Sequence, residues 1–304
     1  MALMMPKPEE EILANRDRLI ERLRDFLPAE SVIDNETARR AYECDALTMY
    51  RQLPLVVVLP ETVEQVSKVM ALANEMNVKV VPRGAGTSLS GGSLPLGDGI
   101  LLGMGKFNRV LEVDVANRCA RVQPGVANLA ITKAVEHLGF YYAPDPSSQI
   151  ACSIGGNVGE NAGGVHCLKY GLTTNNLLGL QVVLMDGEII ELGGKHLDSE
   201  AYDLMGLMTG SEGLLGVITE VTVRILQKPQ TARGMLMGFP SLDDGANCVA
   251  DIIAAGIIPS GLEMMDNMAI IAADDFQACG YPRDAESLLI CELDGTASEV
   301  DHLI

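Results

Sequence analysis

The amino-acid sequence predicts an α+β protein with more than one domain. At 304 residues the chain is long enough for two domains and a sizeable buried core. The apolar runs Leu55–Leu59 and Val78–Val81 flank a helical pattern, which is the order of a βαβ unit with parallel strands. From Val110 the apolar residues alternate with polar ones, which is typical of antiparallel strands. A parallel unit followed by a mixed part predicts two lobes with a cleft between them.

The first elements are helices and buried strands. Glu9 to Leu27 has the pattern of one amphipathic helix, with Leu13 and Leu23 on its apolar face. Thr62 and Gln65 have the spacing of a capping box, so the helix between the two strands should begin there.

Hairpins follow in the middle of the chain. Strands are expected at 110–115, 119–122, 178–185, 188–192 and 217–226, with a turn at Asp186-Gly187. A short helix is expected from Asn128 to Leu138, where Gly139 ends it.

The last part of the chain predicts a βαβ-type second domain. Strands are expected at 234–239, 261–265 and 287–292, and a helix at 241–255. Thr296 and Glu299 form a capping box that opens a further helix, and the chain stops at Ile304. We therefore expect this chain to be a partial product.

The segment Pro82–Gly92 is the first glycine-rich passage. With four glycines and three hydroxyl residues directly after an apolar run, it can bring backbone N–H groups close to an anion. It lies at the carboxyl end of a parallel strand, where α/β sheets bind ligands. It has no Gly-Lys-Ser/Thr, so it is not a P-loop. Leu89 replaces the third glycine of a Rossmann fingerprint and no helical pattern follows, which disfavours that fold.

Two further glycine-rich passages have the same character. In the first, Tyr142–Ser148 is predicted to be extended or turned, because each proline disfavours helix at the residue before it. The segment Cys152–Gly164, with five glycines and two asparagines, is predicted to be a loop without secondary structure that lines a flat ligand. The other passage is Met208–Thr219. Three such passages favour one extended ligand over three unrelated turns.

Composition excludes several function classes. The net charge of −19 argues against a nucleic-acid partner. No apolar run reaches the length of a membrane span, and Met1–Met5 is too short for a signal peptide, so we expect a cytoplasmic protein. Seven scattered cysteines without a Cys-x-x-Cys spacing predict neither a disulfide framework nor an iron–sulfur or zinc site.

Five motifs together resemble a known family. They are Pro82–Gly92, Tyr142–Ser148, Cys152–Asn157, Glu160–Gly164 and Gly210–Gly213, and they resemble the FAD-binding domain of the vanillyl-alcohol oxidase (PCMH-type) superfamily. Within it the chain is most similar to the FAD-binding subunits of bacterial glycolate oxidase, near the D-lactate and D-2-hydroxyglutarate dehydrogenases. The resemblance extends from about Val32 onward.

The resemblance implies a fold and its boundaries. We expect an N-terminal helical segment (1–50), a PCMH-type FAD-binding domain of two α+β lobes (51–228) and the first part of an incomplete ferredoxin-like cap (229–304).

The resemblance also implies the residues that hold FAD. The first passage would bind the pyrophosphate, Pro144 to Asn157 would run along the flavin, and the remainder would reach the ribose and adenine. The implied cofactor-binding residues are Pro82, Arg83, Gly84, Ala85, Gly86, Thr87, Ser88, Leu89, Gly91, Gly92, Pro144, Asp145, Ser147, Ser148, Gly155, Gly156, Asn157, Asn161, Ala162, Gly163, Gly164, Glu212, Gly213, Gly216, Val217 and Ile218.

Many relatives tether the flavin through a histidine in or near the first loop. None occurs there, so we expect non-covalent FAD. The family's closing segment, with its His-x-Gly-Asp-Gly-Asn-x-His motif, has no counterpart here, so no catalytic residue and no metal ligand is carried over.

The implied chemistry is oxidation of a small 2-hydroxy acid by hydride transfer to flavin, with glycolate first and D-lactate next. The implied partners are other glycolate oxidase subunits, including an iron–sulfur subunit, and through them a peripheral association with the membrane. The alternatives are an FAD-binding fragment or assembly subunit without catalysis, and a nucleotide-phosphate binding module, which the absent Lys-Ser/Thr weakens.

Overall fold

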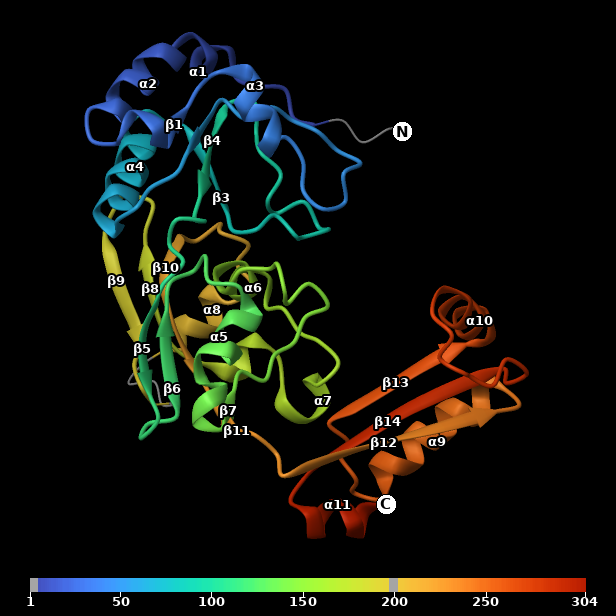
Figure 1. Cartoon of the computed structure of the whole chain (residues 1–304). Coiled ribbons are helices and arrows are strands. Elements are labelled where there is room, and N and C mark those ends of the chain that lie inside the picture. The colour runs from blue at the N-terminus through green and yellow to red at the C-terminus, as the bar shows by residue number, and fades with distance from the viewer. Residues whose placement is uncertain (1–4, 197–201) are drawn as a thin grey trace. The chain divides into compact units, whose positions relative to one another are not determined.

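The computed structural model describes residues 5–196 and 202–304 and divides into two compact units (Figure 1). The N-terminal unit comprises residues 1–142, 147–162 and 176–226, and the C-terminal unit comprises 143–146, 163–175 and 227–304. The domain boundaries after 50 and 228 stay predictions. Most of Met1–Met5, on which the signal-peptide prediction rests, lies outside the described residues.

The first sheet of the N-terminal unit contains the predicted βαβ unit. Its strands are β1 (Val32–Ile33), β2 (Val56–Val58), β3 (Lys79–Arg83) and β4 (Gly99–Gly103), in the order β1-β2-β4-β3. Strands β2 and β3 are parallel as predicted, but β4 lies between them and pairs with both. Helix α4 (Val63–Glu75) connects them and begins at the predicted Thr62–Gln65 capping box.

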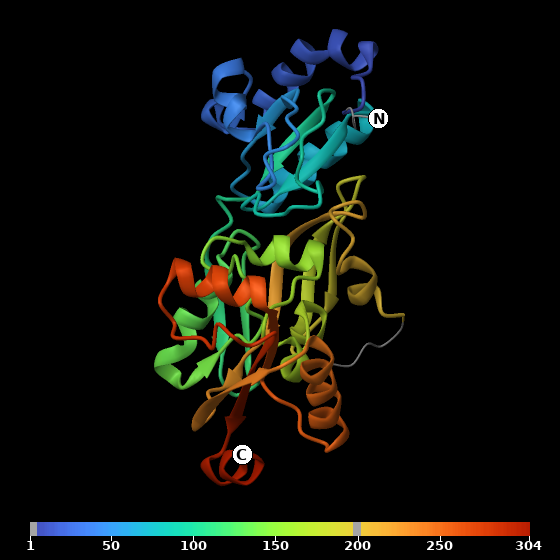
Figure 2. The ribbon, with the colours of Figure 1, turned by 90° about the vertical axis from the view of Figure 1, so that its right-hand side faces the viewer.

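The N-terminal helix differs from the prediction. The single helix expected from Glu9 to Leu27 is two helices, α1 (Glu10–Ala14) and α2 (Arg16–Arg24). The break is at Asn15, whose ψ is 5° and whose side-chain amide donates to the Glu11 carbonyl. In α1, before the break, Ile12 rather than Leu13 is buried, while Leu23 of α2 enters the core as expected. Both helices lie against the first sheet (Figures 1 and 2).

The second sheet of the N-terminal unit consists of the predicted hairpins. Its strands are β5 (Val110–Asp114), β6 (Cys119–Val122), β8 (Leu177–Val183), β9 (Ile189–Gly193) and β10 (Val217–Arg224). The order is β5-β6-β10-β8-β9, and every neighbouring pair is antiparallel. Along β10, buried and half-buried residues alternate, as a period of two requires. Helix α5 (Asn128–Val135) contributes Ile131 and Val135 to the core over this sheet, and Gly139 follows as expected with φ of 82°.

The prediction of a structureless segment at 152–164 was wrong. Residues Ile154–Glu160 form helix α6. Ile154 and Val158, one turn apart, are fully buried, so burial of this face outweighs the low helix propensity of the glycines between them. Gly155 is required for another reason, because a Cβ there would lie 2.5 Å from Cβ of Pro124.

The C-terminal unit is built on three strands. They are β12 (Thr231–Phe239), β13 (Gly261–Asp266) and β14 (Ser287–Gly295), in the order β12-β14-β13. Both outer strands are antiparallel to β14, so β12, helix α9 (Leu242–Ala254) and β13 form the split βαβ unit of ferredoxin-like folds.

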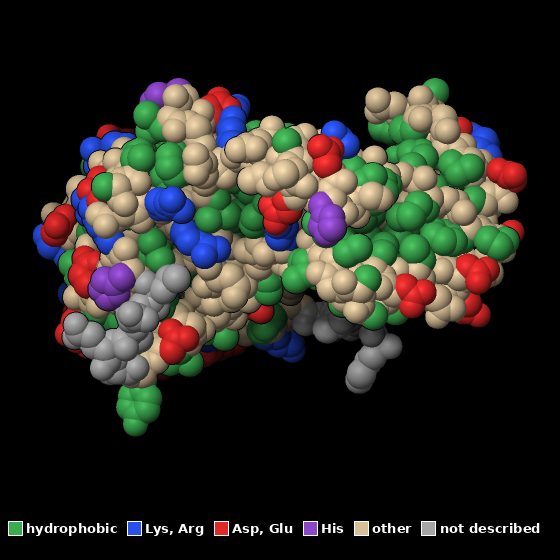
Figure 3. Space-filling model, turned by 90° about the horizontal axis from the view of Figure 1, so that it is seen from below, with side chains coloured by type: hydrophobic (Ala, Val, Ile, Leu, Met, Phe, Trp, Pro, Cys, Tyr) green, Lys and Arg blue, Asp and Glu red, His purple; other side chains and the backbone are tan. Residues whose placement is uncertain are grey.

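Two helices of the C-terminal unit follow its strands β13 and β14. Helix α10 (Asn267–Phe276) was not predicted, whereas α11 (Ala297–Leu303) begins at the predicted Thr296–Glu299 capping box. Hydrophobic side chains gather on the face of this unit that Figure 3 shows. Exposed large hydrophobic residues of the unit include Leu236, Leu242, Ile253, Met264 and Phe276.

The remaining elements are short. They are η1 (Ala29–Ser31), α3 (Glu36–Arg39), η2 (Arg40–Tyr42), η3 (Glu136–Leu138), β7 (Phe140–Tyr141), α7 (Cys167–Tyr170), η4 (Thr173–Asn176), α8 (Leu204–Met208) and β11 (Leu226–Gln227). Within residues 5–196 and 202–304, no helix has the length and apolar character needed to cross a membrane.

Candidate functional site

The first glycine-rich loop follows β3 and offers unused backbone donors. Residues 84–98 form neither helix nor strand, and Gly86 and Gly91 have φ values of 70° and 92° that glycine adopts without strain. In the described part of the chain, the amide N–H groups of residues 84–89 donate to no acceptor. Several free amides in one glycine-rich loop are donors that can converge on an anion.

Arg83 places a cation beside these amides. It is the last residue of β3, and its Nη1 donates to the Tyr42 carbonyl over 3.0 Å. Its guanidinium lies so close to Gly86 that a Cβ there would be 2.7 Å from Nε. Burial lowers the pKa of Arg83, yet a guanidinium remains charged at neutral pH. The loop therefore combines unused amides with a half-buried positive charge.

The structure brings the three glycine-rich passages together within the N-terminal unit. The Gly210 amide donates to the Val158 carbonyl over 2.8 Å, and the Glu212 amide donates to the Gly159 carbonyl over 2.9 Å. A Cβ on Gly213 would lie 3.0 Å from Cγ of Pro82. The third passage thus contacts both helix α6 and the beginning of the first loop.

Ser153, which the sequence did not single out, is a buried donor at the same place. It precedes α6, is 4% exposed, and its Oγ has no hydrogen-bond partner within the described residues. A Cβ on Gly84 would overlap this Oγ. A buried hydroxyl without a partner costs free energy that a ligand atom can recover. The glycine contact and this hydroxyl fit a cofactor whose phosphates approach the backbone.

Glu160 gives the other side of the loop a negative charge, and it too was missed. Its carboxylate accepts from Ser88 Oγ at 2.9 Å and from Ser90 Oγ at 3.1 Å. A Cβ on Gly92 would lie 3.2 Å from Glu160 Oε1 and 3.0 Å from Glu212 Oε2. Two carboxylates repel phosphate and accept hydrogen bonds from sugar hydroxyls. A lone acid within an otherwise uncharged glycine-rich segment is the signal that could have identified Glu160.

A cavity of about 200 Å³ lies against the second half of the loop. One wall is a carboxylate, because Asp45 is 3% exposed, its Oδ1 accepts from the Leu47 amide, and its Oδ2 has no partner among residues that the structure describes. The cavity is lined by Met5, Asp45, Leu47, Tyr50, Leu89, Ser90, Gly91 and Leu94. It suits a compact apolar group that carries a hydrogen-bond donor.

Several residues that were predicted to bind the cofactor have a structural role in the fold, and their side chains do not face a ligand. Asn157 is 3% exposed, and its amide donates to Asn128 Oδ1 over 2.8 Å. Val217 is buried in the core, and a Cβ on Gly216 would lie 2.7 Å from Val182 Cγ1. Asn161 ends helix α6 in the left-handed conformation. These residues can therefore contact a ligand through their backbone atoms rather than their side chains.

The predicted set is divided between the two units. Ser147 and Ser148 belong to the N-terminal unit, where the Ser148 carbonyl accepts from the Ala151 and Cys152 amides. Four residues belong to the C-terminal unit: Pro144, Asp145, Gly163 and Gly164. There a Cβ on Gly164 would overlap the Asp145 carbonyl oxygen, so these two segments lie in direct contact.

Two family models match the chain. Residues 54–193 match the model described as FAD binding domain, and residues 228–303 match the model described as FAD linked oxidases, C-terminal domain. The first range contains the first loop and helix α6, and the second contains the split βαβ unit.

Individual proteins give the same picture. The chain is 56% identical to the glycolate oxidase subunit GlcD of Escherichia coli (strain K12) over 95% of its own length and 58% of that protein. It is 32% identical to a D-lactate dehydrogenase of Anaerostipes hadrus over 92% of its length and 60% of that protein. The chain thus spans less than two thirds of each of these relatives.

Solved structures share the fold. An alkyldihydroxyacetonephosphate synthase superposes with a TM-score of 0.80 at 21% identity, over 100% of this chain and 59% of that protein. A p-cresol methylhydroxylase superposes with a TM-score of 0.80 at 17% identity, over 99% of this chain and 64% of that protein.

Proposed function

Because this chain belongs to the FAD-linked oxidases and contains their FAD-binding domain, we propose that it is the flavin-binding subunit of a 2-hydroxy-acid dehydrogenase. Glycolate is the substrate we favour and D-lactate the next, since identity is 56% to a glycolate oxidase subunit and 32% to a D-lactate dehydrogenase. The observation that carries the proposal is the junction of the unused loop amides, Arg83 and Ser153 beside a second and third glycine-rich passage.

We assign the pyrophosphate to the amide side of the first loop. The N–H groups of residues 84–89 would donate to phosphate oxygens, and Arg83 would offset their charge. Ser153 Oγ would supply a further donor. The opposite side, where Glu160 accepts from Ser88 and Ser90, would take ribose or ribityl hydroxyls.

When bound, FAD supplies the two-electron acceptor for oxidation of the hydroxyl-bearing carbon of the substrate. This chain's residues would bind and orient the cofactor. The Pro82–Gly92 loop contains no histidine, which supports a non-covalent complex.

We propose partner subunits that remove the electrons. The Escherichia coli relative is named as a subunit of glycolate oxidase, and this sequence contains no Cys-x-x-Cys spacing of its own. An iron–sulfur subunit would fill that role, and a peripheral association with the membrane would run through it.

A second candidate is an FAD-binding unit without catalysis, such as an assembly subunit. The two candidates share the cofactor site and differ only in turnover.

Anaerobic titration separates them. The chain is loaded with FAD, and its flavin absorbance is followed after addition of glycolate, D-lactate or L-lactate. The dehydrogenase reading expects bleaching by glycolate or D-lactate but not by L-lactate. Bound FAD that dithionite reduces but no 2-hydroxy acid bleaches would contradict it and leave the second candidate. Failure to bind FAD at all would contradict both.

A further inference from the structure

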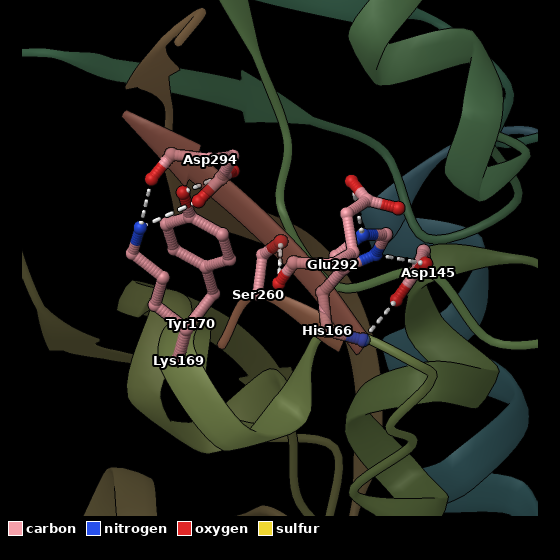
Figure 4. A network of polar contacts seen from close by, with 7 residues as sticks. All are labelled: Asp145, His166, Lys169, Tyr170, Ser260, Glu292 and Asp294. Carbon is pink, nitrogen blue, oxygen red and sulfur yellow. Dashed lines mark hydrogen bonds and ion pairs between the residues drawn. The ribbon is translucent and has the colours of Figure 1, made fainter. Parts of the chain in front are cut away.

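A group of polar side chains in the C-terminal unit joins two loop segments to strand β14 (Figure 4). His166, Lys169 and Tyr170 stand at positions i, i+3 and i+4 around α7, so they share one face. Glu292 and Asp294 alternate along β14 and share one face of the sheet. The helix face meets the strand face.

At Asp294, both carboxylate oxygens and the backbone carbonyl oxygen accept hydrogen bonds from Lys169 and Tyr170. Lys169 Nζ donates to the Asp294 carbonyl at 2.6 Å and to its Oδ1 at 2.5 Å, and Tyr170 Oη donates to Oδ2 at 2.6 Å. Asp294 is only 7% exposed, so these bonds are shielded from water. They fix the 166–170 stretch on β14.

The half around His166 carries a titratable group. Asp145 receives two hydrogen bonds from one residue, from the His166 amide to Oδ1 over 3.3 Å and from Nδ1 to Oδ2 over 2.6 Å. Nε2 lies 3.7 Å from Glu292 Oε1. Burial would lower the pKa of His166, but the hydrogen bond and charge of Asp145, with the charge of Glu292, outweigh it and raise the pKa. The remaining charges nearby, Lys169 and Asp294, are paired with each other.

The Asp145–His166 pair joins the two segments of this unit that contain predicted cofactor-binding residues. Asp145 lies in the 143–146 segment, and His166 follows Gly164 by two residues. Gly164 touches the Asp145 backbone so closely that no side chain fits, and its amide donates to Cys167 Sγ. The Asp145–His166 bonds therefore hold two backbone segments in one fixed arrangement.

We propose that Asp145 and His166 position one wall of the FAD site, with Glu292 tying that wall to strand β14. This inference rests on the proposed function, because it takes the segments 143–146 and 163–164 as that wall. His166 acts through these segments and is a positioning residue. The protonated imidazole attracts both carboxylates, whereas the neutral ring turns a lone pair toward Glu292. The wall is therefore held best below the pKa of His166 and loosens as the pH rises through it.

The test is FAD affinity as a function of pH. The dissociation constant of FAD is measured by flavin fluorescence between about pH 6 and about pH 9, a range that spans the titration of a histidine with a raised pKa. The variants are His166→Gln, His166→Arg and Asp145→Asn, with His137→Gln as the matched control because His137 is exposed on η3. Circular dichroism checks that each variant folds.

We expect the wild-type affinity to fall severalfold from the acidic to the alkaline end, because the raised pKa of His166 means that the imidazole loses its proton within this range. His166→Gln should bind weakly at both ends and lose the pH dependence. His166→Arg keeps a cation that does not titrate, so it should retain affinity at alkaline pH. His137→Gln should follow the wild type.

Two results would overturn the inference. One is a pH profile in His166→Gln that matches the wild type, and the other is a His166→Arg affinity no better than that of His166→Gln at alkaline pH. Glycolate bleaching is recorded on the same samples. If the wild type binds FAD with the expected profile and does not bleach, the proposed function fails and the positioning role stands.

Discussion

The hydroxyl oxygen of Ser153 occupies the space that a side chain on Gly84 would need. Gly84 opens the first loop and Ser153 precedes helix α6, so this contact sets the distance between the two segments that would hold the cofactor phosphates. A side chain at position 84 cannot fit unless Ser153 or the loop moves.

Replacing Gly84 by alanine should therefore impair FAD binding more than folding. The added methyl group must displace Ser153 or the loop, and we expect FAD to bind at least about tenfold more weakly, which is about 1.4 kcal/mol. The matched control is Gly105→Ala, since a Cβ at Gly105 meets nothing within 4 Å. Isothermal titration with FAD makes the comparison, and equal affinities of the two variants would refute the close approach.

Arg83 should contribute to FAD binding through its positive charge and the N–H donors of its guanidinium group. Arg83→Ala removes a half-buried cation beside the loop amides, and charge-assisted hydrogen bonds of this kind contribute about 1.5–3 kcal/mol. We expect FAD affinity to fall by about ten- to a hundredfold, with Arg83→Lys between the two. Arg18→Ala, on the exposed face of α2, is the control. If Arg83→Ala binds FAD like the wild type, the pyrophosphate does not lie on this side of the loop.

Some of this arrangement could be predicted because its causes are local in the sequence. The Thr62–Gln65 and Thr296–Glu299 capping boxes satisfy backbone groups within one turn, so their residues alone determine where α4 and α11 begin. The glycines of Pro82–Gly92 point to a ligand loop in the same way, since positive φ at Gly86 and Gly91 is a property of single residues.

The rest depends on contacts that no short pattern contains. Helix α6 forms because Ile154 and Val158 are buried by the second sheet. The glycines between them have a low helix propensity, so propensity alone does not predict this helix. Glu160 becomes part of the site through Ser88, 72 residues earlier in the chain. Asp145 and His166 are hydrogen-bonded within the C-terminal unit, although residues 147–162 between them in the sequence belong to the other unit.

The buried face of α6 gives a stability prediction. Ile154 has no exposed surface, so Ile154→Ala should lower the free energy of unfolding by about 2–5 kcal/mol through lost burial and a cavity. Ile150 is 77% exposed, and Ile150→Ala should change it by less than about 0.5 kcal/mol. Urea denaturation followed by circular dichroism measures both. Similar losses in the two variants would mean that residues 154–160 do not pack as α6.

Glu160 allows the two sides of the first loop to be tested separately. Its carboxylate accepts from Ser88 and Ser90, and we assign it to sugar hydroxyls rather than phosphates. Glu160→Gln removes one negative charge and half of the acceptor capacity while keeping the shape of the side chain. FAD should bind up to about tenfold more weakly, because a hydrogen bond to a charged group is replaced by one to a neutral amide.

Inorganic pyrophosphate carries no sugar hydroxyl that could donate a hydrogen bond to Glu160. It should therefore compete with FAD in Glu160→Gln at least as well as in the wild type. The neighbouring Glu212 carboxylate remains in both proteins. Glu188→Gln, on the exposed β8–β9 turn, is the charge-matched control and should leave both ligands unaffected. If Glu160→Gln instead binds FAD more tightly, the phosphates lie beside the Ser88 and Ser90 hydroxyls. An anion at that position would bind more tightly once the repelling negative charge of Glu160 is removed.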